Sequence, residues 1–205
     1  MKRRLPLLVE RSVGQVDTLR QDLSDRFELA VKTNANVSCR AGCSHCCYHP
    51  ISISILEAIA VYRWLVKNHR WTTGLKKRVQ EAADRQIGVS YEVWLLSLIP
   101  CPLLNDEKLC SAYEARPLVC RTYFSLGDPH YCHPHRLGEN TKMVPREELV
   151  KAYHNEQTKV LRRHRLQLTT LPIGSALLLA EQICEGETEL SNVDKLIFKE
   201  YLDHA

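Results

Sequence analysis

Four cysteines and two histidines fall within twelve residues of this sequence, "CRAGCSHCCYHP", which runs from Cys39 to Pro50. This density of sulfur limits the folds open to the chain, because such a segment must form disulfides, carry thiol chemistry or bind a metal. The 205-residue chain contains nine cysteines. In the reducing cytosol, where structural disulfides are rare, a dense cysteine pattern favours metal binding or catalysis.

The rest of the composition favours a cytoplasmic protein. The apolar run from Leu5 to Val9 follows a basic start but ends at Glu10, so it is too short for the apolar part of a signal peptide. No window approaches the roughly 18 apolar residues that a membrane helix needs. The formal net charge is only +4, from 28 basic and 24 acidic residues, without the excess of basic residues typical of nucleic-acid-binding domains. We therefore expect neither a membrane segment nor a nucleic-acid partner.

Apolar residues at steps of three and four predict helices on both sides of the cysteines. One such stripe runs over residues 7–32, and Ser54 with Glu57 has the spacing of a capping box that starts a second helix. Helical patterns return over residues 145–204, with Pro145 at a plausible first helical position. The helices expected there cover about residues 145–168, 173–185 and 189–202.

A second group of four cysteines lies in a loop-rich stretch from Pro100 to Thr141, at positions 101, 110, 120 and 132. Around the turn residues Asn105 and Asp106, two short apolar arms are predicted to bring Cys101 and Cys110 together. So long an irregular stretch is awkward in a compact domain unless something besides backbone hydrogen bonds holds it. Metal–thiolate bonds would do so, since structural zinc contributes on the order of 10 kcal/mol to folding.

These patterns together predict an all-α, mostly helical single domain over residues 1–205. An irregular cysteine-rich metal-binding loop region forms its core over about residues 36–135, flanked by the helical stretches 7–32 and 145–204. The chain lacks the alternation of strands and helices that builds a parallel sheet.

The spacing of Cys39, Cys43 and Cys46 lets three thiolates converge on one iron–sulfur cluster or one metal ion. Because adjacent residues tend to point apart, Cys46 and Cys47 are expected to serve different metals, or one of them to bind and the other to pack. All-cysteine ligation suits both zinc and iron–sulfur clusters. The CxxxCxxC spacing is similar to the signature with which radical S-adenosylmethionine enzymes hold a four-iron cluster, which favours [4Fe–4S] over zinc. The strand–helix barrel of those enzymes is not predicted here.

The segments "CRAGCSHCCYHPISISILEA", "CPLL", "LCSAYEARPLVCRTY" and Cys132 together resemble the CxxCxxCC cysteine-cluster family of zinc- or iron-chelating, YkgJ-like proteins. The resemblance covers roughly residues 36–135. It implies chelation by Cys39, Cys43, Cys46, Cys47, Cys101, Cys110 and Cys120, with Cys132 as an addition. One branch of the family resembles flagellin lysine methylases, which implies a use of S-adenosylmethionine.

Two groups of residues beside the cysteines have alternative interpretations. Arg116 and Arg121 are predicted to bind the cofactor, because guanidinium groups offset thiolate charge and donate hydrogen bonds to sulfur; Arg116 alternatively pairs with a carboxylate or a helix end. His130, His133 and His135 surround Cys132 in a spacing that could bind zinc. An equally good interpretation is that these three histidines are solvent-exposed residues of a polar loop.

Three functions follow from these features. The first is a non-enzymatic protein that chelates a metal ion or an iron–sulfur cluster, and it predicts that all ligands of the bound group come from the protein. The second is a cluster-dependent enzyme, such as an S-adenosylmethionine-using methyltransferase acting on a protein substrate. The third, a thiol oxidoreductase, is less favoured because the strand–helix–strand context of thioredoxin-like proteins is absent.

Overall fold

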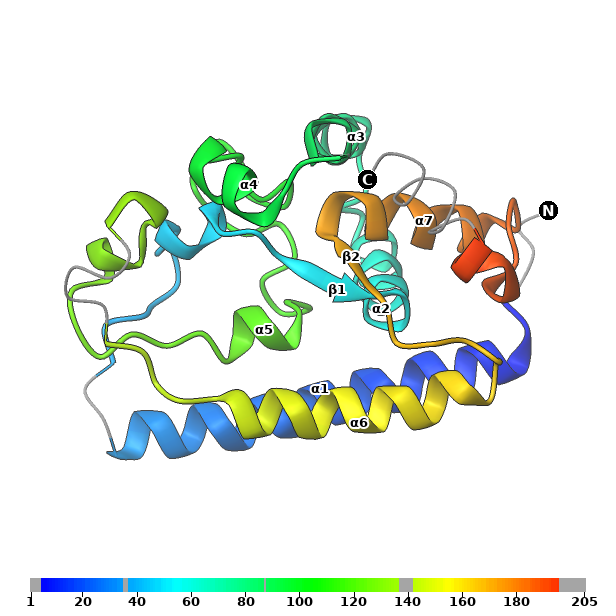
Figure 1. Cartoon of the computed structure of the whole chain (residues 1–205), viewed down its shortest axis with the longest axis horizontal. Helices are drawn as coiled ribbons and strands as arrows, with labels where there is room; N and C mark the ends of the chain where they lie inside the picture. The colour runs from blue at the N-terminus through cyan, green and yellow to red at the C-terminus, as the bar shows by residue number, and fades with distance from the viewer. Residues whose placement is uncertain (1–4, 35–36, 87, 137–141, 196–205) are drawn as a thin grey trace.

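The computed structural model describes residues 5–34, 37–86, 88–136 and 142–195 and is mostly helical, as predicted, with one small antiparallel sheet (Figure 1). Its α-helices are α1 Leu7–Asn34, α2 Ile55–Lys67, α3 Thr73–Gln86, α4 Tyr91–Ser97, α5 Leu118–Arg121, α6 Glu147–Arg162 and α7 Ile173–Glu185. The strands are β1 Ser52–Ser54 and β2 Thr170–Pro172. The 3₁₀ turns are η1 His45–Tyr48, η2 Pro129–Cys132, η3 Pro134–Arg136 and η4 Leu190–Asn192.

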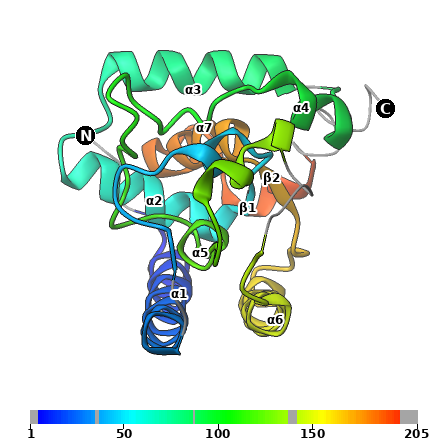
Figure 2. The same cartoon turned by 90° about the vertical axis from the view of Figure 1, so that its left-hand side faces the viewer.

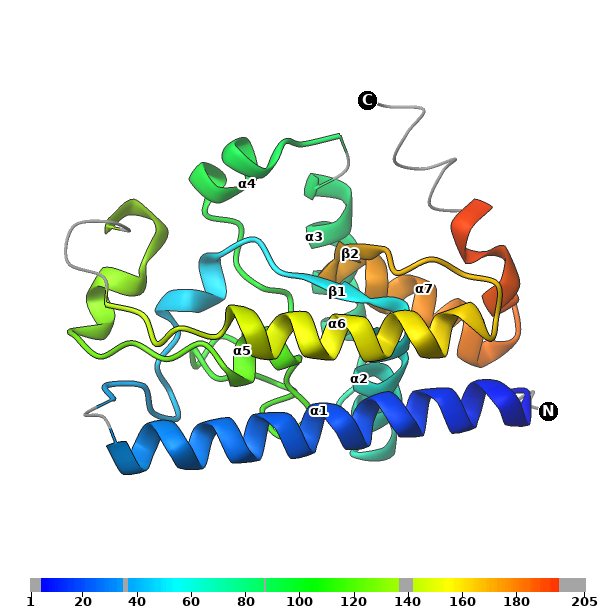
Figure 3. The ribbon, with the colours of Figure 1, turned by 60° about the horizontal axis from the view of Figure 1, so that its bottom comes forward.

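The long helices α1 and α6 run antiparallel along one side of the molecule, and α2, α3 and α7 pack above them (Figures 1 and 2). The turns η1, η2 and η3 contact one another toward one end of the molecule, and α5 lies nearer the middle, against α1 (Figure 3). We call residues 39–50 and 101–132 the cysteine region. Its position at one end leaves the other end of the molecule to the helices.

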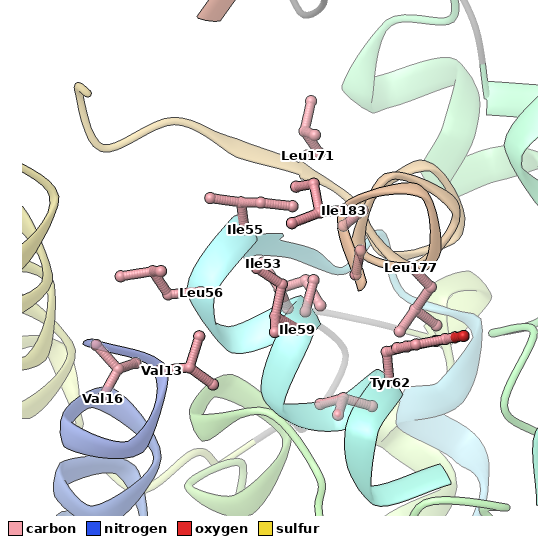
Figure 4. Close-up of a cluster of buried hydrophobic side chains, with 14 of the residues drawn as sticks. Val13, Val16, Ile53, Ile55, Leu56, Ile59, Tyr62, Leu171, Leu177 and Ile183 are labelled. Atoms are coloured by element: carbon pink, nitrogen blue, oxygen red, sulfur yellow. The ribbon is translucent and has the colours of Figure 1, made fainter. Parts of the chain in front are cut away.

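The hydrophobic core lies between α1, α2 and α7 (Figure 4). Val13 and Val16 of α1 face α2, whose Leu56 and Ile59 are fully buried, and Leu177 of α7 meets them from the other side. Burying each such side chain contributes about 1.5–3 kcal/mol. This core consists mainly of helix side chains, and Cys101, Cys110 and Cys184 pack against its edge.

The helix beginning at Ser54 forms as predicted. The Ser54 hydroxyl oxygen accepts a hydrogen bond from the Glu57 backbone N–H at 3.3 Å and so caps α2. The predicted helices 7–32 and 173–185 are confirmed as α1 and α7, the latter with the same bounds.

The helix predicted over residues 145–168 is shorter than expected. Pro145 lies outside it, Arg146 is its N-cap, and α6 ends at Arg162. Arg165 then adopts a left-handed φ of 59°, and the chain enters β2, which pairs with β1. The prediction was wrong here because a left-handed turn ends the helix, with the Leu166 N–H donating to the Leu161 carbonyl at 3.2 Å.

The two strands were not predicted, because each has only three residues. Ile53 pairs with Leu171 in the antiparallel register, and the Ile173 N–H extends the pairing by donating to the Ile51 carbonyl at 2.9 Å. This pairing joins the segment just after the first cysteine group to the start of α7.

The last predicted helix, 189–202, lies partly outside the described residues. Its described part begins with η4. In the described residues, no helix is both long and apolar enough to cross a membrane.

Candidate metal centre

Six cysteines from the two halves of the cysteine region line one pocket of about 170 Å³. They are Cys43, Cys46, Cys47, Cys101, Cys110 and Cys120. A water molecule needs only roughly 10–15 Å³ of such space, so the pocket has room for a group much larger than one water molecule. The two cysteine groups, distant in the sequence, thus face a common cavity.

The first group is shaped by two tight turns. Gly42 has a φ of 87°, which residues with a side chain rarely adopt, and the next residue, Cys43, donates its N–H to the Arg40 carbonyl at 3.1 Å. The η1 turn follows, so both Cys46 and Cys47 line the pocket. Whether the two cysteines serve different metals, or one binds and the other packs, remains a prediction.

The second group begins with the predicted turn. Leu104 and Cys110 form an antiparallel bridge, and the Asn105 N–H donates to the Leu109 carbonyl at 2.9 Å. This brings Cys101 and Cys110 to the pocket together. The Cys101 N–H also donates to the Cys47 carbonyl at 2.7 Å, so the backbone itself joins the two cysteine groups.

Cys39 and Cys132 lie beside the pocket and do not line it. The Cys39 sulfur accepts a hydrogen bond from the Ser125 N–H at 3.3 Å. Burial raises the pKa of the Cys132 thiol, a hydrogen bond with Ser125 opposes the rise, and repulsion from Cys39 adds to it. The two thiols are therefore neighbours around Ser125, while the ninth cysteine, Cys184, lies apart in α7.

Burial raises the pKa of the Cys101, Cys110 and Cys120 thiols, and mutual repulsion between the thiols of the pocket raises it further. For Cys46 the main cause of the raised pKa is a hydrogen bond with Cys47, followed by burial. Without a cation these thiols hold their protons at neutral pH. A bound metal reverses this preference, because a coordinating thiol is deprotonated.

Three cationic side chains line the same pocket, and no Asp or Glu is among the described residues that line it. The Arg116 guanidinium stacks on the Tyr113 ring at 3.7 Å, and that of Arg146 lies 4.9 Å from the Tyr123 ring centre. The third is Lys108, whose ammonium donates to the Tyr48 hydroxyl at 3.1 Å. This lining suits a group of negative net charge, such as a metal bound by several thiolates.

Arg146 lines the pocket but was not predicted from the sequence. Arg121 was predicted to bind the cofactor but does not line the pocket. Arg121 extends toward α1, where it donates to Asp25 at 2.5 Å and to Gln21 at 2.7 Å. Arg146 lies in the sequence outside the cysteine region, at the start of α6, and no local pattern marks it. The preceding residues, "MVP", indicated only that a helix starts there.

The histidines form a cluster beside the pocket. Ring centres are 5.5 Å apart for His45 and His130 and 5.6 Å apart for His133 and His135. His49 lines the pocket and donates from Nε2 to the Cys132 carbonyl at 2.6 Å. Across the described ranges, no three His, Cys, Asp or Glu side chains are grouped so that they could hold a metal ion as they stand. The predicted zinc site at His130, His133 and His135 remains a prediction.

Comparison with known proteins gives one match. The model of the CxxCxxCC family, described as "Putative zinc- or iron-chelating domain", matches residues 38–160. No curated protein and no solved structure matches the chain. The matched region contains all eight cysteines of the candidate site, whereas α1, β2 and α7 lie outside it.

Proposed function

Since this chain belongs to the CxxCxxCC family of zinc- or iron-chelating domains, we propose that its six-cysteine pocket is the chelating site and that the bound group is an iron–sulfur cluster of the [4Fe–4S] type. The observation that carries the proposal is the lining of one cavity by six thiols from two distant stretches of the chain. The family description fits zinc as well as iron.

The donor set and the space support a cluster. Thiolates are the ligands of both zinc and iron–sulfur centres. A single zinc ion, with Zn–S bonds of about 2.3 Å, draws its four sulfurs to within about 3.8 Å of one another. A cluster keeps its ligands farther apart, because iron and sulfide ions lie between them. The cysteines here line an open cavity of about 170 Å³, which accommodates the larger group.

Four thiols are the first candidates for ligands: Cys46, Cys101, Cys110 and Cys120. Burial and repulsion from Cys46 raise the pKa of Cys101, Cys110 and Cys120, and a hydrogen bond with Cys47 followed by burial raises that of Cys46. Cys43 and Cys47 are alternatives on the same wall. Cys39 and Cys132 are candidates for a neighbouring centre or for exchange of ligands.

When bound, a cluster would supply one-electron transfer and a covalent link between the two cysteine groups. Arg116, Arg146 and Lys108 would offset the negative charge of its thiolates. Positive charge near a cluster raises its reduction potential.

Anaerobic purification with iron, sulfide and zinc analysis tests the proposal. We expect brown protein with iron and acid-labile sulfide, and loss of both in Cys120→Ser. Cys184→Ser is the matched control, because that thiol is also partly buried but lies in α7. Colourless protein with stoichiometric zinc would replace the cluster by zinc. Equal metal content in wild type and Cys120→Ser would remove Cys120 from the ligands.

A second candidate is a cluster-dependent enzyme that uses S-adenosylmethionine to methylate a protein. The pocket favours it in one respect: Tyr91 and Tyr113 line it and are 58% and 37% exposed, so a substrate could reach the cavity from solvent. Transfer of a labelled methyl group to a protein acceptor, lost in Cys120→Ser, would establish this activity. A thiol oxidoreductase has less support, because the raised pKa of the pocket thiols opposes formation of the reactive thiolate.

A further inference from the structure

The shortest α-helix in the described part of the chain carries one of the candidate ligands. The helix α5 has four residues, Leu118–Arg121, and contains Cys120. So short a helix does not hold its own conformation in water, because nucleation fixes several residues for very few hydrogen bonds. The position of the Cys120 thiol must therefore be set by contacts with other parts of the chain.

Three charged side chains from three different parts of the fold hold the backbone of this segment. Arg20 of α1 donates from Nη1 to the Arg116 carbonyl at 2.7 Å. Glu57 of α2 accepts the Leu118 N–H on Oε1, also at 2.7 Å.

The third side chain comes from the start of α6. Arg146 donates from Nη1 to the Val119 carbonyl and, at 3.3 Å, to the Thr122 hydroxyl. Successive backbone groups between residues 116 and 119 are thus held from α1, α2 and α6, the helices that surround α5 (Figures 1 and 2).

Two of these side chains are buried, which is costly for charged groups unless their hydrogen bonds are satisfied. Arg20 and Glu57 are each 4% exposed. Arg20 also pairs with Asp17, with its Nη2 2.7 Å from Oδ1. Glu57 occupies the capping-box position, from which its side chain would ordinarily reach back to the Ser54 N–H. Here its carboxyl group instead accepts from Leu118, in the segment that bears Cys120.

We propose that Arg20, Glu57 and Arg146 are positioning residues for the metal centre: together they fix residues 116–120 so that the Cys120 thiol and the Arg116 guanidinium face the pocket. The metal-dependent part of this inference rests on the proposed function. The fixing of the Cys120 thiol does not, because it concerns the metal-free chain as well.

Glu57 allows the sharpest test, because two substitutions separate its hydrogen bond from its charge. Glu57→Gln keeps an acceptor oxygen for the Leu118 N–H and removes the charge, whereas Glu57→Leu removes both. Partners that orient metal ligands typically change metal affinity by about 10- to 100-fold when mutated. We expect Glu57→Leu to release metal about 10- to 100-fold faster than wild type, with an altered absorption spectrum. Glu57→Gln should stay close to wild type in both.

Glu181→Leu is the control for a general loss of stability. Glu181 of α7 accepts from Trp71 Nε1 at 2.9 Å and pairs with Lys76 at 2.8 Å, away from the pocket. It should lower the melting temperature without changing the spectrum or the release of metal. Arg20→Met is a second variant for the case that Glu57→Leu does not fold, and it should show the same pattern as Glu57→Leu.

Alkylation of metal-free protein by iodoacetamide, mapped by mass spectrometry, gives a readout that needs no metal. We expect Glu57→Leu to speed alkylation of Cys120 relative to Cys184, and Glu57→Gln not to do so. If the Leu and Gln variants behave alike, or if Cys120 and Cys184 become reactive together, the positioning role is wrong. If wild type binds no metal but Cys120 alone becomes exposed in Glu57→Leu, the proposed function fails and the positioning role stands.

Discussion

The helices and the cysteine region are held together in different ways. Leu56, Ile59 and Leu177 in the helical core are 0% exposed and contact one another across α2 and α7. Of the eight cysteines in the cysteine region, only Cys132 is fully buried, and six of them line a cavity. The helices thus supply most of the apolar core, which Leu103 and Leu118 extend into the cysteine region. The rest of the cysteine region surrounds a cavity that a bound group would fill. This difference predicts that metal stabilises one region and leaves the other nearly unchanged.

Removal of metal should produce the largest difference in stability between the cysteine region and the helical core. A structural metal contributes on the order of 10 kcal/mol, and we expect that contribution to be concentrated in residues 39–50 and 101–132. Hydrogen exchange before and after chelation should show lost protection there and retained protection in α2 and α7. Equal protection of the cysteine region in both states would mean that the bound group does not hold it together.

A cavity in the helical core should have the opposite effect. Leu177→Ala removes a fully buried side chain of α7 and should lower the free energy of unfolding by about 2–5 kcal/mol. Urea unfolding measures this loss. The metal-to-protein ratio should stay at the wild-type value under native conditions. A parallel loss of metal would show that the two regions are not independent.

The pH dependence of metal binding should report on the cysteine region alone. Because burial raises the pKa of Cys101 and Cys110 above the ordinary 9.0, the metal-free folded protein keeps their protons, and a metal must displace them. Metal affinity should therefore rise with pH, about tenfold per pH unit for each proton displaced. Competition with a chromophoric chelator at several pH values measures the slope, and a flat profile would contradict ligation by these thiols.

In the metal-free protein, the same raised pKa values should make the stability fall as pH rises, whereas the metal affinity rises. A group whose pKa is higher in the folded state contributes stability below its unfolded pKa, and that stability is lost as pH rises through the folded pKa. We expect the stability contributed by Cys101 and Cys110 to be complete below pH 9.0 and to fall above it. Urea unfolding of metal-free protein across this range, with Leu177→Ala for comparison, tests the direction.

The smallest effects should separate the two arginines of "ARPLVCR". Arg116 lines the pocket and Arg121 pairs with Asp25 of α1. Arg116→Gln should lower the reduction potential of a bound cluster, because it removes a positive charge near the thiolates. Arg121→Gln should leave the potential unchanged, because the Arg121 guanidinium donates to Gln21 and Asp25 of α1 and does not line the pocket. Equal shifts of potential in both variants would show that distance from the pocket does not decide the effect.

Most of the helices could be predicted from the sequence because their signals are local. The apolar stripe of α1, the cap at Ser54 and the run that forms α7 each lie within a few turns of the element they specify. The turn at Asn105 is equally local, since the residue's own side chain accepts the Leu109 N–H at 2.7 Å. Such features follow from capping and turn chemistry alone.

The features that could not be predicted depend on contacts between distant residues. The β1–β2 pairing joins strands of three residues that lie far apart in the chain. The directions of the Arg121 and Arg146 side chains depend on where α1 and α6 pack, and the sequence near each arginine does not record this. The cysteine pattern indicated the kind of chemistry, but the shared cavity and its cationic lining required the fold.

The pairing of β1 with β2 also indicates how long a fragment of the chain must be to retain the pocket. Ile173 lines the pocket and donates its N–H to Ile51, yet it lies beyond residue 160, where the family match stops. A fragment that ends at residue 160 would lack Ile173, which lines the pocket, and the hydrogen bond that attaches Ile173 to Ile51. Recombinant fragments intended to retain the cavity should therefore extend at least through α7.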